Sequence, residues 1–208
     1  METLDLAVSV LDRYLSVASE LTSHRLTVAA LTALFVAGKV EEVCTPEVED
    51  CLVGVTSYGS AHIVAMERRM LAALEFRVTA PLAIRCLQRG LRACQADAFL
   101  SHLAEYVLAL TWGVAALRTQ LPSVAAAASL LVAREAAGAE PAWHCTLEHY
   151  TGVSQARVAQ AAAAVRDGLA HGPHNGLTAV QERYALAQYQ RVAQDDRVVA
   201  YLARLCTP

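Results

Sequence analysis

Apolar residues recur three and four positions apart along most of this chain, the spacing that places them on one face of an α-helix. No sustained alternation of β-branched and polar residues, as in strands, accompanies them. Much of the apolar content is alanine, which suits closely packed helices. We therefore predict an all-α protein, with helices near residues 2–18, 24–42, 46–54, 60–75, 81–94, 97–117, 122–137, 145–150, 154–169 and 178–190.

Short polar, glycine- or proline-containing segments separate these predicted helices. The clearest lie at residues 22–23, 57–59, 138–141 and 171–176. We predict a structural role for Pro46, at the start of a helix. Thr45 is a suitable N-cap and Pro46 suits the first helical position, so we expect the 46–54 helix to begin there.

The order of predicted elements repeats once along the chain. Lys39 and Arg134 are 95 positions apart, and so are Pro46 and Pro141. Each half has a nearly all-apolar helix, a connector that reaches a proline, a short helix and a long amphipathic helix. We therefore predict two tandem helical bundles, over residues 1–78 and 79–190, and a tail over 191–208.

Two charges lie where apolar residues are expected. Lys39, the only lysine beside sixteen arginines, closes the apolar run 26–38 of a helix that is expected to be buried all round. Glu67 falls on the same helical stripe as Ile63 and Leu71. Lys39 could simply extend its ammonium to solvent at a helix end. Because lone charges are rarely buried, the two are otherwise either partners of each other or together bind an outside ligand.

Charge differs between the halves. Residues 1–78 carry eleven acidic and six basic side chains, and residues 79–208 carry nine and eleven. An acidic cluster near the end of the Lys39 helix suits either a solvated helix junction or a basic partner protein. The arginines are scattered, and no apolar run is long enough to cross a membrane, so we predict neither nucleic-acid nor membrane binding. The cluster comprises Glu41, Glu42, Glu47, Glu49 and Asp50.

No arrangement of residues points to catalysis. The sequence has no glycine-rich phosphate loop, no nucleophile elbow and no carboxylate pair in polar surroundings. Cys145 and His149 are one helical turn apart, but a zinc site needs a second such group. We therefore predict no enzyme activity, no cofactor and no metal.

Four segments of the first half resemble the cyclin box, and three segments of the second half resemble the second box of A- and B-type cyclins. The first four are residues 11–16 (LDRYLS), 34–42 (LFVAGKVEE), 45–50 (TPEVED) and 66–76 (MERRMLAALEF). The other three are residues 121–128 (LPSVAAAA), 146–152 (TLEHYTG) and 181–184 (QERY).

This resemblance implies two cyclin-box bundles that bind and activate a cyclin-dependent protein kinase, in the nucleus and cytoplasm. It assigns Lys39 and Glu67 to hydrogen bonds with the kinase backbone, Val36 and Phe76 to apolar contacts, and Glu42 to the arginines of the activation segment. Only the first half has both charges, so we expect it alone to bind the kinase. The alternative is a non-activating adaptor or degenerate paralogue of the same fold.

In the family, the first box begins with a helix that lies before the segment matched by Met1. The resemblance therefore implies that this box is incomplete. The missing helix carries the arginine that pairs with the aspartate matched by Asp12. Its absence leaves one side of Leu31, Leu34 and Phe35 uncovered, and we expect an exposed apolar groove there.

Overall fold

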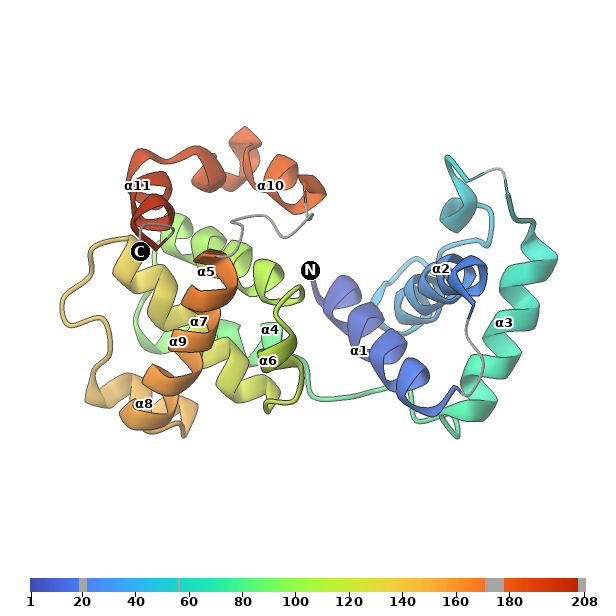
Figure 1. The fold of residues 1–208 in the computed structure, drawn as a ribbon, viewed down its shortest axis with the longest axis horizontal. Coiled ribbons are helices and arrows are strands. Elements are labelled where there is room, and N and C mark those ends of the chain that lie inside the picture. The colour runs from blue at the N-terminus through green and yellow to red at the C-terminus, as the bar shows by residue number, and fades with distance from the viewer. Residues whose placement is uncertain (19–21, 56, 171–177, 206–208) are drawn as a thin grey trace. The chain divides into compact units, whose positions relative to one another are not determined.

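The computed structural model describes residues 1–18, 22–55, 57–170 and 178–205, and all regular structure in that part of the chain is helical (Figure 1). The all-α prediction is therefore confirmed. The chain divides into two units, Met1–Leu82 and Ala83–Pro208, which are described separately. None of the helices in the described part is long and apolar enough to cross a membrane.

Helix α2 (Ser23–Glu41) forms the centre of the first unit. It contacts α1 (Glu2–Val17) and α3 (Ser60–Ala73), as well as a single 3-10 turn, η1 (Asp50–Leu52). Because these elements bury much of the surface of α2, the helix can be apolar on more than one face. The side chain of Thr22 accepts a hydrogen bond from the Arg25 backbone N–H and begins the helix.

The prediction of a helix over 46–54 is wrong, because only η1 forms there and Pro46 precedes it outside any helix. The Asp50 carboxylate accepts a hydrogen bond from the Glu47 backbone N–H at 2.8 Å, which closes one tight turn. Gly54 follows with a φ of 79°, which a helix does not allow. A tight turn, closed by a side chain that accepts from the backbone three residues earlier, thus replaces the expected helix.

Pro46 nevertheless lies in a well-defined contact. A Cβ atom placed on Gly38 would be 2.7 Å from the Pro46 Cγ, closer than two carbon atoms can approach. The proline ring therefore packs on α2 where the helix has no side chain. This contact fixes the direction in which the acidic segment leaves α2.

The side of α2 that was expected to be uncovered is only partly exposed. Phe35 is 3% exposed, so the prediction that it lacks cover is wrong. The Lys39 ammonium lies over its ring, 4.0 Å from the centroid, and supplies part of that cover. Leu31 and Leu34 are half-buried.

The second unit is built around α7 (Pro122–Ala136), whose apolar residues are nearly all buried. Helices α4, α5 and α9 contact it on different sides. The elements of this unit other than α7 are α4 (Ala83–Ala93), α5 (Ala98–Thr111), α6 (Ala115–Arg118), α8 (Cys145–Thr151), α9 (Gln155–Ala170), α10 (Thr178–Tyr184), η2 (Ala187–Tyr189), η3 (Val192–Gln194) and α11 (Asp196–Leu205).

Two of the predicted helices in this unit are interrupted. The helix expected over 97–117 ends as α5, and a turn through Gly113 and Val114 leads into α6. The turn lets Val114 pack on α9 at Gly168, where a Cβ atom would clash with a Val114 methyl carbon. The helix expected over 178–190 is likewise divided into α10 and η2.

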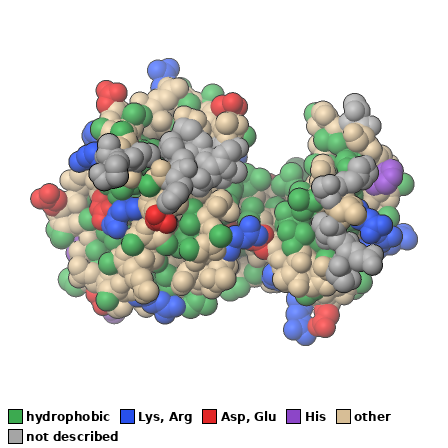
Figure 2. All heavy atoms as spheres, in the orientation of Figure 1, with side chains coloured by type: hydrophobic (Ala, Val, Ile, Leu, Met, Phe, Trp, Pro, Cys, Tyr) green, Lys and Arg blue, Asp and Glu red, His purple; other side chains and the backbone are tan. Residues whose placement is uncertain are grey.

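The segment 191–208 contains η3 and α11, and α11 contacts α7, α9 and η3. Its described residues are therefore part of the second unit. On the face shown in Figure 2, positive and negative side chains of this unit are interspersed. The predicted break at 138–141 is present, whereas the one at 171–176 lies outside the described residues.

Candidate functional site

Lys39 and Glu67 lie side by side on the first unit. The Lys39 Nζ atom is 2.7 Å from the Glu67 Oε1 atom, and the two side chains are 38% and 15% exposed. Lys39 stands in the last turn of α2, where a cation is favoured by the helix dipole. Glu67 lies in the middle of α3, so the ion pair joins α2 to α3.

Buried apolar residues hold both members of this pair in place. Lys39 rests over the Phe35 ring, and Glu67 is flanked on α3 by Ile63 and Met70, both 0% exposed. Within the described residues, one ammonium proton and one carboxylate oxygen account for all the hydrogen bonds of the pair. An ammonium has three donors and a carboxylate two oxygens. The pair can therefore bind backbone carbonyl and N–H groups of a partner without separating.

Phe76 presents an aromatic ring to solvent just beyond α3. It is 73% exposed, and both Glu75 and Phe76 have left-handed backbones, with φ of 51° and 58°. The Phe76 backbone N–H donates to the Leu71 carbonyl at 2.9 Å, which ends the helix. An exposed aromatic ring on a fixed turn is a typical anchor for a protein partner.

Arg13 stabilises this turn, a role that the sequence analysis missed. Its guanidinium donates to the carbonyl oxygens of Arg77 and Val78, both at 2.6 Å, and so ties α1 to the chain after α3. Burial lowers the pKa of Arg13. Its sequence neighbours Asp12 and Tyr14 are half-buried and buried, respectively. The available signal in the sequence was that Arg13 lies within the segment 11–16, which resembles the cyclin box.

Glu42 lies at the C-cap of α2 and is exposed. Its backbone N–H donates to the Gly38 carbonyl, and its carboxylate accepts a hydrogen bond from the hydroxyl of Thr3 on α1. The segment that follows reaches solvent, with Val43 at 102% and Val53 at 80% exposure. The acidic cluster therefore stands on a solvent-facing segment that contacts α2 through Pro46 and η1.

Val36 does not belong to this surface. It is 3% exposed and therefore lies in the core of the first unit, where α1 and α3 contact α2. The structure thus brings Lys39 and Glu67 together, leaves Phe76 and Glu42 accessible at other points of the unit, and directs Val36 inward.

The repeat-related helix end in the second unit is arranged differently. Arg134, the counterpart of Lys39, donates to the carbonyl oxygens of Ala142 at 2.8 Å and Pro141 at 3.0 Å. The neighbouring Glu135 binds Arg166 through both carboxylate oxygens and accepts a hydrogen bond from the Tyr201 hydroxyl. These charged side chains thus bind groups of their own unit. The sequence analysis also missed this network.

Comparisons with known proteins agree with the resemblance. The family model of the cyclin N-terminal domain matches residues 1–79, and that of the cyclin C-terminal domain matches residues 81–197. The chain is 32% identical over 200 residues to cyclin-A1-1 of Oryza sativa subsp. japonica, covering 93% of this chain and 39% of that protein.

Two B-type relatives show a similar relation. Identity is 30% over 193 residues both to cyclin-B1-5 of Oryza sativa subsp. japonica and to the G2/mitotic-specific cyclin-B of Marthasterias glacialis. Each alignment covers 92% of this chain, and 43% and 50% of the respective relatives. The chain thus spans about two fifths to one half of the length of these relatives.

Proposed function

Because this chain belongs to the cyclin family, we propose that it is a regulatory subunit that binds and activates a cyclin-dependent protein kinase in cell-cycle control. Members of the family are regulatory subunits that partner with such kinases. The proposed role is therefore regulatory and not catalytic.

The observation that carries the proposal is the Lys39–Glu67 pair. A surface ion pair contributes little to stability, typically below about 1 kcal/mol. Yet this pair includes the only lysine of the chain, is partly dehydrated, and rests on the buried ring of Phe35. Its remaining donors and acceptor suit the backbone groups of a partner helix. Phe76 adds an apolar anchor, and the acidic segment from Glu42 onward suits a basic activation segment.

Activation follows if this surface binds the active form of the kinase more tightly than the inactive form. The subunit can shift the kinase equilibrium only by the difference between these two affinities. A change from 1% to 99% active kinase requires a difference of about 5.5 kcal/mol. Contacts that fit only the active position of a mobile kinase helix supply such a difference, because they are absent in the inactive form.

Substitution of the pair tests the proposal. We expect Lys39→Ala and Glu67→Ala each to weaken association with a cyclin-dependent kinase by roughly 2–5 kcal/mol, since each leaves a desolvated polar group of the interface without its partner. Lys39→Arg should also weaken binding, because a planar guanidinium replaces a compact ammonium. Calorimetric titration against a panel of purified cyclin-dependent kinases measures these affinities.

Arg69→Ala is the matched control. Arg69 is exposed on α3, two residues from Glu67 and therefore on a different side of the helix. It should leave the affinity nearly unchanged. Unchanged binding by both Lys39→Ala and Glu67→Ala would show that the interface is wrong. A chain that binds the kinase through this pair but does not raise its activity toward a peptide substrate would instead be the non-activating adaptor.

A further inference from the structure

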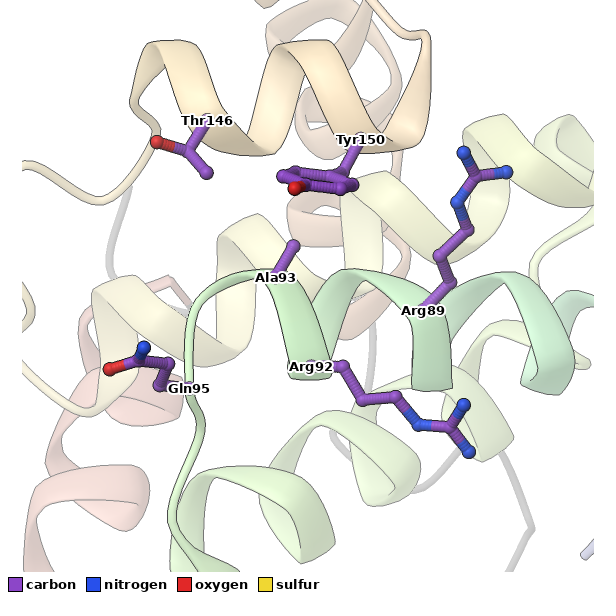
Figure 3. Close-up of a pocket in the computed structure, with 6 residues that line it drawn as sticks. All are labelled: Arg89, Arg92, Ala93, Gln95, Thr146 and Tyr150. Atoms are coloured by element: carbon purple, nitrogen blue, oxygen red, sulfur yellow. The ribbon is translucent and has the colours of Figure 1, made fainter.

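A hollow in the second unit lies between α4 and α8. Its volume is about 600 Å³, and it opens to solvent. Residues of α4 and the turn after it form one side, and α8 forms the other (Figure 3). Its lining consists of Arg89, Arg92, Ala93, Gln95, Thr146 and Tyr150. This hollow is in a different unit from Lys39 and Glu67, and the proposed kinase contacts do not use it.

The hollow is basic, because two arginines and no acidic residue line it. Helix α4 carries three arginines and no acidic residue. Arg89 and Arg92 are exposed, and neither makes an ion pair within the described residues. No carboxylate is among the lining residues. The nearby Asp97 lies outside the lining, and its carboxylate accepts a hydrogen bond from the Leu100 backbone N–H at the start of α5.

The remaining lining groups are neutral and of two kinds. Gln95 and Thr146 offer an amide and a hydroxyl, which can hydrogen-bond to a peptide backbone. Ala93 and the ring of Tyr150 offer apolar surface, and Tyr150 is 48% exposed. A hollow lined by arginines, neutral hydrogen-bonding groups and an aromatic ring suits a peptide better than a free inorganic ion.

The directions of the two arginine side chains indicate whether the hollow would bind one anionic group or several. In Figure 3, Arg89 extends on the same side of α4 as Tyr150, whereas the side chain of Arg92 diverges from it. Two guanidinium groups that diverge do not close on one phosphate. They suit separate carboxylates spaced along one chain, each of which a planar guanidinium can bind through two hydrogen bonds.

We propose that this hollow, formed by α4 and α8, docks an acidic peptide segment of a protein partner. Arg89 and Arg92 bind two of its carboxylates, Gln95 and Thr146 bind its backbone, and Tyr150 packs against an apolar residue between the acids. The inference does not depend on kinase activation, because the hollow lies within the second unit alone.

Fluorescence anisotropy with the whole chain and a fluorescein-labelled peptide of alternating glutamate and leucine tests this proposal. We expect saturable binding that weakens as salt concentration rises. Arg89→Gln and Arg92→Gln should each weaken it about five-fold, as for exposed ion pairs near 1 kcal/mol. Arg157→Gln, which removes an exposed arginine of α9 outside the hollow, should leave it unchanged. Far-UV circular dichroism of each variant verifies that it is folded.

Three outcomes would overturn the proposal. One is equal binding of a peptide in which glutamine replaces every glutamate. Another is an Arg89→Gln/Arg92→Gln double variant that binds as tightly as the original chain while remaining folded. The third is tighter binding of the glutamine peptide with a single phosphoserine, which would assign the hollow to one phosphate group instead of spaced carboxylates.

Discussion

The ends of α2 and α7 occupy equivalent places in the two repeats but use their charges in opposite ways. Lys39 of α2 forms an ion pair with Glu67 at the surface, and the pair keeps unused hydrogen-bonding capacity within the described residues. Arg134 of α7 binds two carbonyls of its own connector. At the next position, α2 has Val40, which is 42% exposed, whereas α7 has Glu135, which binds Arg166 and Tyr201.

This difference indicates how the same helical arrangement can use a charged helix end either to hold the unit together or to leave hydrogen-bonding groups unused. In the second unit, polar side chains at the helix end hold the connector and α11 in place. Their hydrogen-bonding groups are therefore already used within the unit. In the first unit, Pro46 packed on Gly38 holds the connector instead. Within the described residues, Lys39 therefore bonds to Glu67 and not to the connector. Substitutions at matched positions should consequently change stability in the second unit and binding in the first.

Removal of the Glu135 carboxylate is expected to have the largest effect on stability. Glu135→Ala leaves the half-buried Arg166 guanidinium and the Tyr201 hydroxyl without their partner, which should cost about 3 kcal/mol of unfolding free energy. Trp112 and Trp143, the two tryptophans of the chain, lie in the second unit, so their fluorescence during urea unfolding reports on that unit. The exposed Glu148 provides the control, and Glu148→Ala should shift the midpoint little.

Arg134→Ala should come next. It removes two hydrogen bonds from a charged donor to the Pro141 and Ala142 carbonyls, at a cost of about 2 kcal/mol. This exceeds the value below about 1 kcal/mol that applies to an exposed arginine, because Arg134 is half-buried. Kinase affinity should remain within a few-fold. An affinity loss as large as that of Lys39→Ala would mean that both units share the interface.

Tyr201→Phe should cost about 1.5 kcal/mol, the lower end for a hydrogen bond to a charged group. Burial and the bond to Glu135 raise the pKa of Tyr201 to about 12, above the value near 10 expected in the unfolded chain. The neutral hydroxyl therefore stabilises the fold below pH 10, and this contribution is lost as the pH rises toward 12. Urea titrations at several pH values should show a smaller alkaline loss for Tyr201→Phe than for the original chain.

Gly38→Ala should have the smallest net effect, about 1 kcal/mol. The new methyl group would lie 2.7 Å from the Pro46 Cγ, and overpacking of this kind costs roughly 1–3 kcal/mol. The higher helix propensity of alanine offsets about 1 kcal/mol of that cost. The equivalent position of α7 already has a methyl group, on Ala133. A far-UV circular dichroism melt that shifts without a change in tryptophan fluorescence would place the effect in the first unit.

The sequence by itself determined the helical class, most of the helices and the unusual positions of Lys39 and Glu67 on apolar helix faces. Helical periodicity is a local property, so a charge that falls on an apolar stripe is visible from spacing alone. The chain also shows the repeat that makes Arg134 the counterpart of Lys39. These features need no knowledge of what packs against each helix.

Only the tertiary structure decided which apolar residues cover the core and which face solvent. Val36 and Phe76 are both apolar, yet they are 3% and 73% exposed, because one lies in the packed core of the first unit and the other in a left-handed turn. Arg13 binds carbonyls 64 and 65 residues away, and Glu135 binds side chains 31 and 66 residues away. Spacing along the chain cannot reveal such contacts, because they form only when distant helices pack together.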